Sequence, residues 1–498
     1  MSTSLSIPDG AFTGIEGLDD VLGGGFAGQR LFLIEGLPGT GKTTLALQFL
    51  LAGAERKESV LYITLSETEN ELRAVAASHG WSLDGVTIRE LVSAEDHLHP
   101  DKQYTVFHPS EVELSETTKS LLTDVEQLAP SRVVFDSLSE FRLLAGSALR
   151  YRRQILALKQ FFAERRCTVL LLDDVTAQDH DLQVQSIAHG VVQLEQLNPE
   201  YGTERRRLRV LKYRGLRFRG GYHDFSIRPG GLIVFPRLVA AEHRAFPIHE
   251  KLATGLAQLD TLLGGGVERG TSTLIVGGPG TGKSSVAAQL AAACAARGQR
   301  AAMFIFDEGL HTLLTRAEGL GIDLRGAVER KQVTVQQVDP AELAPGEFVH
   351  QIRSAVTKGQ AALVVIDSLN GYLNAMPDER FLATQLHELL TYLGQLGVAT
   401  VLIGAHKGII AGPMTSPIDA SYLADAIILI RYYELEGEVR QAISVVKKRG
   451  GAHERTIRDF RLEPGGIRVG EPLRSLRGVL SGVPMYDDGA KARAGVVQ

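Results

Sequence analysis

The stretch RLFLIEGLPGTGKTTLALQFLLAGA, residues 30–54, decides the fold. It begins with a short apolar run typical of a buried strand, continues through a Gly-rich turn, and ends in a helical pattern over residues 43–54. The turn matches Gly-x-x-x-x-Gly-Lys-Thr, a motif whose backbone N–H groups and helix N-terminus bind phosphate. The sequence therefore predicts a P-loop between a strand and a helix.

The chain carries this stretch twice. GLPGTGKT at residues 36–43 recurs as GGPGTGKS at residues 277–284, and TGIEGLDDVLGGG at residues 13–25 recurs as TGLAQLDTLLGGG at residues 254–266, both 241 residues later. DFSIRPGG at residues 224–231 recurs as DFRLEPGG at residues 459–466, 235 residues later. Landmarks in one order at near-constant offsets indicate a domain copied in tandem. We predict a first domain over residues 1–240, a second over 241–484 and a short flexible tail over 485–498, with the boundary between residues 236 and 250.

Each copy alternates strand-like and helical segments. Further buried-strand runs lie at residues 59–65, 132–136 and 168–173 in the first copy and at 301–306, 361–367 and 400–403 in the second. Strands that alternate with helices are typical of a mostly parallel sheet flanked by helices. We therefore predict an α/β fold of two tandem P-loop NTPase domains, each built on such a sheet.

The residues predicted to bind nucleotide in the P-loops are Gly36, Gly39, Thr40, Gly41, Lys42, Thr43 and Thr44 in the first copy and Gly277, Gly280, Thr281, Gly282, Lys283, Ser284 and Ser285 in the second. Lys42 and Lys283 would neutralise the outer phosphates, and the hydroxyls of Thr43 and Ser284 would hold Mg²⁺. The alternative, a Gly-rich loop that only turns the chain, fits one loose motif better than two full matches.

Acidic residues follow the predicted strands of both copies. Asp136 and Asp367 each end an apolar run downstream of a P-loop, where a carboxylate would organise the metal. The strand after the P-loop helix ends in Glu67 in the first copy and in the pair Asp307 and Glu308 in the second. These three acids are the predicted catalytic residues, because a carboxylate must orient or deprotonate the attacking oxygen. A solvated strand end is the alternative.

One pair of cations lies on a strand-like run late in each copy: Lys212 with Arg214 in the first copy, and Lys447 with Arg449 in the second. Alternation puts the Lys and Arg of Lys-x-Arg on one face of a strand. Two cations aimed together suit a γ-phosphate, and an Arg supplied from a neighbouring chain stabilises transition-state charge. Ordinary surface charge is the alternative. The surrounding residues 205–219 hold eight basic residues in fifteen, which could also form a nucleic-acid stripe, but few aromatic residues interleave them.

Composition excludes several classes of protein. The 498 residues include 53 Lys and Arg against 58 Asp and Glu, a net charge of −5, so no global basic field attracts nucleic acid. Two cysteines, Cys167 and Cys294, cannot form a disulfide framework or a four-cysteine zinc module. The sequence contains no secretory signal at residues 1–12 and no stretch of about 18 apolar residues. We expect a cytoplasmic protein with neither a nucleic-acid nor a membrane partner.

Together, the duplication, both P-loops, the acids and both Lys-x-Arg-Gly strands resemble the KaiC family of double-domain RecA-like ATPases. The resemblance covers the chain from Thr13 to about Pro484. It implies ATP and Mg²⁺ as ligands and a homo-oligomeric, two-tiered ring, a hexamer, with ATP bound between neighbouring subunits. Lys212, Arg214, Lys447 and Arg449 would then reach the neighbour's nucleotide. A regulatory protein partner is a further implication.

In that family the second domain is also an autokinase. Counting back from the run DAIILI at residues 425–430, Ser421 falls on the family's acceptor Ser, and Tyr422 stands where the clock proteins have Thr. The same count in the first copy reaches Gln185 and Ser186, so an acceptor hydroxyl at the position of Ser421 is peculiar to the second domain. The resemblance thus implies a serine autokinase with Ser421, or Tyr422, as phosphoacceptor.

The tail departs from the family pattern. Only fourteen residues follow Pro484, fewer than in the charged tail of the clock proteins, so we expect an ATPase and autokinase of signalling or clock-like regulation rather than a circadian oscillator. Two alternatives remain: a RecA/RadA-type DNA-dependent ATPase on the same fold, and a scaffold that uses ATP only to hold a ring together. The acidic net charge and the duplicated ATPase argue against the first, and the intact Glu67 and Glu308 against the second.

Overall fold

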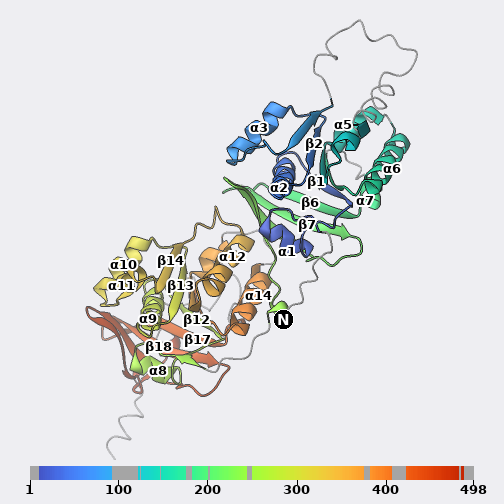
Figure 1. Ribbon diagram of the computed structural model, residues 1–498. Helices are drawn as coiled ribbons and strands as arrows, with labels where there is room; N and C mark the ends of the chain where they lie inside the picture. The colour runs from blue at the N-terminus through green and yellow to red at the C-terminus, as the bar shows by residue number, and fades with distance from the viewer. Residues whose placement is uncertain are drawn as a thin grey trace, which may run out of the picture. The chain divides into compact units, whose positions relative to one another are not determined.

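The computed structural model of the chain describes residues 10–91, 122–123, 125–145, 147–174, 182–199, 202–243, 250–374, 382–405, 422–481 and 484–486. The chain divides into two compact units, one ending at Arg237 and the other beginning at Leu238 (Figure 1). Leu238 and Ala240 are buried in a core cluster of the second unit, and the Ala240 N–H donates to the Glu388 carboxylate at 2.9 Å. The chain just after the division therefore packs with the second unit.

The first unit is built on a nine-stranded sheet of order β3-β2-β4-β5-β1-β6-β7-β8-β9. Its strands are β1 (Leu31–Gly36), β2 (Val60–Thr64), β3 (Thr87–Glu90), β4 (Arg132–Asp136), β5 (Thr168–Asp174), β6 (Gly190–Leu197), β7 (Arg205–Tyr213), β8 (His223–Arg228) and β9 (Gly231–Phe235). The pairs from β3 to β6 are parallel, and β7, β8 and β9 continue the sheet antiparallel. Strand β1, which leads into the P-loop, lies between β5 and β6.

The second unit repeats this topology strand for strand, in the order β14-β13-β15-β16-β12-β17-β18-β19-β20. Its strands are β12 (Ser272–Gly277), β13 (Arg300–Ile305), β14 (Val333–Gln337), β15 (Ala361–Asp367), β16 (Ala399–Ala405), β17 (Ala426–Leu435), β18 (Glu438–Lys448), β19 (Arg458–Glu463) and β20 (Gly466–Pro472). Two short two-stranded sheets join β10 (Lys251–Leu252) to β11 (Val267–Glu268) and β21 (Leu476–Arg477) to β22 (Met485–Tyr486).

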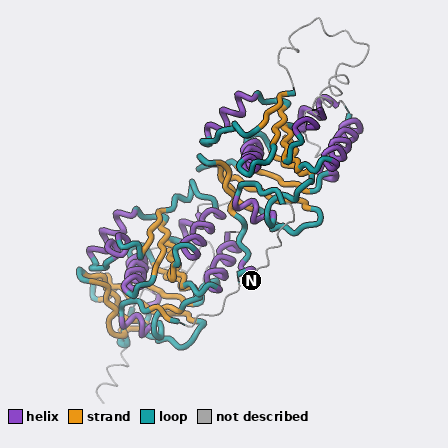
Figure 2. The backbone as a smooth tube through the Cα atoms, viewed as in Figure 1, coloured by secondary structure: helices purple, strands orange, loops and turns teal. Residues whose placement is uncertain are grey.

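Helices cover both faces of each sheet (Figure 2). In the first unit, α1 (Glu16–Leu22), α2 (Lys42–Ala54) and α3 (Glu69–Ser78) share one core cluster, and α5 (Leu138–Ala145), α6 (Ala148–Glu164) and α7 (Leu182–Ile187) share the other. In the second, α8 (Ala257–Leu262), α9 (Lys283–Ala296), α10 (Leu310–Gly319) and α11 (Leu324–Glu329) lie on one face and α12 (Pro345–Thr357), α13 (Leu369–Asn374) and α14 (Leu382–Gln395) on the other.

Strand β1 shows why the sequence forms these layers. Leu31 and Leu33 pack into one core cluster, while Phe32 and Ile34 pack into the cluster on the opposite face. Because side chains alternate along a strand, a strand covered on both faces must be apolar throughout. The prediction of an α/β fold with two tandem domains, each a mostly parallel sheet flanked by helices, is confirmed.

Strands β7 and β18 end at Tyr213 and Lys448, so Arg214 and Arg449 lie just beyond their strands and not within them as predicted. Among the residues that the structure describes, no helix has both the length and the apolar composition to cross a membrane.

Candidate functional site

The P-loops have the backbone shape that phosphate binding requires. Gly39 and Gly41 have φ angles of 81° and 98°, in the left-handed region that glycine favours, and Gly280 and Gly282 repeat this with 75° and 94°. A Cβ atom on Gly41 would also lie 2.5 Å from Ile227 Cδ1. Each loop runs directly into the N-terminus of α2 or α9, whose first N–H groups are available to an anion.

The P-loop lysines curl back over their own loops. Lys42 Nζ donates to the carbonyl oxygens of Gly36 and Leu37 at 2.8 and 3.0 Å, and Lys283 Nζ donates to two carbonyls of its loop at 2.9 and 2.7 Å. Both side chains are almost buried, and burial lowers the pKa of Lys283. Each ammonium group therefore lies inside the loop where phosphates would bind.

The P-loop hydroxyls meet the predicted metal-positioning acids. The hydroxyl of Thr43 lies close enough to Asp136 at the end of β4 to lower the pKa of that carboxyl, and the hydroxyl of Ser284 does the same for Asp367 at the end of β15. Burial raises the pKa of both aspartates, and the positive charges of Lys42 near Asp136 and Arg316 near Asp367 offset this only in part. A hydroxyl from the first turn of a helix and a buried carboxylate at a strand end suit Mg²⁺, which prefers oxygen ligands.

Asp136 has a partner that Asp367 lacks. The Tyr62 hydroxyl, buried in β2, donates to Asp136 Oδ2 at 2.5 Å, whereas the 241-residue offset puts Met303 at this position of the second copy. Burial and the neighbouring Asp136 raise the pKa of Tyr62 well above its ordinary value, so the phenol stays a donor. The two metal-positioning acids therefore differ in their surroundings.

Glu67 lies three residues beyond the end of β2, and Thr64 holds its backbone. Thr64 Oγ1 donates to the Glu67 carbonyl at 2.7 Å and accepts from its N–H at 3.0 Å. Among the described residues, Glu67 Oε2 is buried and has no hydrogen-bond partner. Burial, and then the charges of Asp136, Glu71 and Asp174, raise the pKa of Glu67. Such an oxygen can accept a proton or a hydrogen bond from a water molecule.

The two acids of the second copy are bonded. Ser368 Oγ donates to Asp307 Oδ2 at 2.5 Å, and Glu308 forms an ion pair with Arg316 of α10 at 2.5 Å. The first copy has Val75 at the position of Arg316, so its Glu67 has no equivalent cation. The two copies therefore hold the predicted catalytic carboxylates in different ways.

The cations of the first copy cap a helix. Lys212 Nζ donates to the carbonyls of Gln185 and Ser186 at 2.6 and 3.0 Å, and Arg214 Nη2 donates to the Ser186 carbonyl at 2.7 Å. Their shared acceptor confirms that the two side chains reach the same side, although Arg214 follows the strand. They lie at the C-terminus of α7, where cations are favoured.

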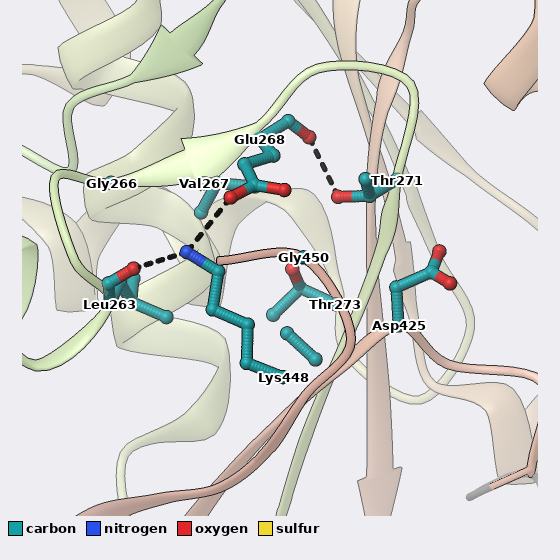
Figure 3. A pocket seen from close by; sticks show the side chains of 10 residues that line it. Leu263, Gly266, Val267, Glu268, Thr271, Thr273, Asp425, Lys448 and Gly450 are labelled. Carbon is teal, nitrogen blue, oxygen red and sulfur yellow. Dashed lines mark hydrogen bonds and ion pairs between the residues drawn. The ribbon is translucent and has the colours of Figure 1, made fainter. Parts of the chain in front are cut away.

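The residue between each pair of cations anchors the strand from the other side. The Tyr213 hydroxyl donates to the Gly25 carbonyl at 2.8 Å. In the second copy, Lys448 forms an ion pair with Glu268 at 2.9 Å and donates to the Leu263 carbonyl at 2.6 Å, within a small pocket (Figure 3). A buried central side chain leaves the flanking Lys and Arg to the opposite face.

The sheet register separates each cation pair from its own P-loop. The Arg214 N–H donates to the His189 carbonyl, and the His189 N–H donates to the Leu31 carbonyl, at the first residue of β1. The P-loop instead follows Gly36, the last residue of β1. Arg214 thus lies at the end of the strands opposite to the P-loop, and the second copy has the same register.

The predicted phosphoacceptors are only partly described. Ser421 lies outside the described residues. Tyr422 is 55% exposed, and its carbonyl accepts a hydrogen bond of 2.6 Å from Arg449 Nη2. This contact repeats the one between Arg214 and Ser186 in the first copy, which supports the alignment of Tyr422 with Ser186.

Sequence reasoning missed three residues of these sites: Tyr62, Asp174 and Arg316. Asp174, the last residue of β5, forms an ion pair with Lys42 at 2.6 Å. Each of the three acts through a contact between elements distant in the sequence, which local patterns do not reveal.

Comparison with known proteins agrees with this geometry. The family model of the KaiC ATPase matches residues 11–239 and 252–474. The circadian clock protein KaiC3 of Synechocystis sp. (strain ATCC 27184 / PCC 6803 / Kazusa) is 26% identical over 480 residues, which cover 95% of this chain and 94% of that protein. The circadian clock oscillator protein KaiC of Synechococcus elongatus (strain ATCC 33912 / PCC 7942 / FACHB-805) is 27% identical over 479 residues, with 95% and 91% covered. The resemblance inferred from the motifs is confirmed, and the chain belongs to the KaiC ATPase family.

Proposed function

We propose that each domain binds ATP with Mg²⁺ and hydrolyses it within a homo-oligomeric, two-tiered ring of six chains, and that the second domain also phosphorylates Ser421. Relatives named as circadian clock proteins support a role in signalling or clock-like regulation with a regulatory protein partner.

The observation that carries the ATPase proposal is the convergence of four groups at the end of β1 in the first domain. Lys42 would neutralise the outer phosphates, and Thr43 and Asp136 would hold Mg²⁺, which when bound neutralises developing charge on the phosphates. Glu67 Oε2, buried without a partner among the described residues, would accept the proton of the attacking water. The second domain supplies Lys283, Ser284, Asp367 and its paired acids.

The ring follows from the position of the cations. Arg214 and Arg449 lie at the end of the strands opposite to their own P-loops, so in our proposal they reach the nucleotide of a neighbouring chain. Cations that complete a neighbour's site stabilise transition-state charge and couple activity to assembly.

The autokinase proposal rests on two features of the second domain. The carboxylate of Asp307 is held at 2.5 Å by Ser368, at a position where the first domain has Ser66. The hydrogen bond from Arg449 to the Tyr422 carbonyl keeps the residue after Ser421 next to the cation that we propose for a neighbour's phosphate. In the proposed step the Ser421 hydroxyl oxygen bonds to the γ-phosphorus, the bond from that phosphorus to the bridging oxygen breaks, and ADP leaves. The hydroxyl proton of Ser421 passes to a carboxylate of the pair Asp307 and Glu308.

Incubating the pure protein with γ-labelled ATP tests both activities, if free phosphate and label on the protein are followed together. We expect label on the peptide of residues 416–425, its loss in Ser421→Ala, Asp307→Asn and Glu308→Gln, and its retention in Tyr422→Phe. Release of phosphate without any labelled protein would leave an ATPase and refute the kinase. Stimulation of phosphate release by added DNA would favour the DNA-dependent alternative instead.

A further inference from the structure

We propose that Asp174 sets the nucleotide affinity of the first site. It is a built-in counter-ion that competes with phosphate for Lys42 and so lowers the affinity of this site for nucleotide. The inference rests on the proposed binding of ATP at the P-loops and adds a difference between the two sites.

The geometry places Asp174 directly against the P-loop. As the last residue of β5, it pairs with Gly36, the first residue of the P-loop motif. Asp174 Oδ1 lies 2.6 Å from Lys42 Nζ, and its own backbone N–H is held by Ser139 Oγ at 3.2 Å. The Lys42 side chain is 8% exposed and that of Asp174 is 29% exposed, so the pair is partly shielded from water.

This ion pair occupies the last donor of Lys42. An ammonium group has three N–H donors. Two of them are directed at the carbonyls of Gly36 and Leu37, and the third is directed at Asp174. A phosphate group must therefore displace one of these acceptors before Lys42 can bind it, and the carboxylate is the one on a movable side chain.

Among the described residues, the second site has no acid in the place of Asp174. Lys283 also donates to two P-loop carbonyls, but in the part of the chain that the structure describes no acid lies within ion-pair distance of it. The strand position that pairs with Gly277, as Asp174 pairs with Gly36, is occupied by Ala405. As far as the chain is described, the third donor of Lys283 thus has no ion-paired carboxylate to lose when phosphate binds.

Displacement does not remove the carboxylate. After Lys42 has turned to phosphate, Asp174 remains at the end of β5, next to the P-loop, where like charges repel. The negative charges of Glu67 and Asp136 lie in the same region, since both interact electrostatically with each other and with Asp174. Mg²⁺ neutralises part of the phosphate charge, so the repulsion is greatest for metal-free nucleotide.

Nucleotide affinity of the first site can be measured in the full chain with the second P-loop disabled by Lys283→Ala. Binding of a fluorescent methylanthraniloyl ATP is titrated with Mg²⁺ and without it. We expect Asp174→Asn to tighten binding by about tenfold with Mg²⁺, the effect of removing one partly exposed competing ion pair, and by more without it. Asp84→Asn is the matched control, because Asp84 is a surface acid of the same unit with a side chain 90% exposed; we expect no change.

The reciprocal variant transfers the effect. In a Lys42→Ala background, Ala405→Asp should weaken binding at the second site by about tenfold, since it adds the competing acid at the matching strand position. Unchanged or weaker binding in Asp174→Asn, in a variant that keeps the parent's melting temperature, would overturn the inference. Failure of the Lys283→Ala parent to bind nucleotide at all would instead refute the proposed function of the first site.

Discussion

Glu67→Gln tests the assignment of the first catalytic site most directly. The change removes one carboxylate charge and keeps the shape of the side chain. Glu67 Oε2 has no hydrogen-bond partner among the described residues, so no protein contact of this oxygen is lost. The carboxylate lies near Asp136, Glu71 and Asp174, and these charges and burial raise its pKa. Neutralising it relieves repulsion, and we expect the melting temperature to stay the same or rise.

Activity should change in the opposite direction. Loss of a general base typically slows a reaction about 10²- to 10⁴-fold, which is about 3 to 5 kcal/mol in activation free energy. We expect the steady-state hydrolysis rate to fall by this factor, with nucleotide affinity nearly unchanged, when the second site is disabled by Lys283→Ala. Glu71→Gln is the control: it is the same chemical change four residues away, and Gln can still serve the capping box that Glu71 forms with Thr68.

The pH profile gives a second readout. A general base must be ionised, and the raised pKa of Glu67 means that hydrolysis at the first site should decline, as pH falls, at a higher pH than for an ordinary glutamate. The acid limb should disappear with Glu67→Gln. Hydrolysis by Glu67→Gln at the rate of its parent would show that Glu67 is only a strand end and that another group activates water.

Three further predictions concern assembly, metal binding and stability. Lys42→Ala should weaken the nucleotide-dependent ring, and native mass spectrometry with and without ATP and Mg²⁺ measures this; a monomer under both conditions in the wild type would exclude the ring. Tyr62→Phe removes a hydrogen bond that lowers the pKa of Asp136, and we expect the pKa of this carboxyl to rise further. The first site should then need more Mg²⁺ at pH 6, which a titration of hydrolysis against Mg²⁺ measures. An unchanged titration would contradict this. His223 is fully buried and accepts a hydrogen bond from the Arg237 N–H at 2.9 Å, and burial lowers its pKa to about 4. Between about pH 6.5 and 4, this histidine is therefore protonated in the unfolded chain and neutral in the folded chain. Stability should fall across that window by up to about 3 kcal/mol, and less so in His223→Gln, as melting curves against pH would show; equal acid sensitivity of the two proteins would contradict the assignment.

The sequence predicted those parts of the fold and sites that are encoded locally. The P-loop, its flanking strand and helix, and the acid at the end of β4 are each recognisable within a few residues, because the chemistry needs fixed spacing along one element. Duplication strengthened each assignment, since a pattern that recurs at one offset is not accidental.

Contacts between distant elements could not be predicted in this way. Asp174 meets Lys42 only because the sheet order places β5 beside β1, and 132 positions separate the two residues. Arg316 reads as an ordinary basic residue on an amphipathic helix until its contact with Glu308 is known. The strand ends at Tyr213 and Lys448 were also missed, because a run of basic residues does not show where pairing stops.

The register that separates Arg214 from its own P-loop has a consequence for enzyme kinetics. If a chain contributes the phosphate loop of one site and the cations of another, dilution below the assembly threshold at a fixed ATP concentration removes activity. The rate per chain should therefore rise with protein concentration before it levels off. Arg214→Ala chains mixed into wild type as a minority should impair sites whose own P-loops are intact. The fraction of activity lost should exceed the fraction of mutant chains only if neighbouring sites also cooperate.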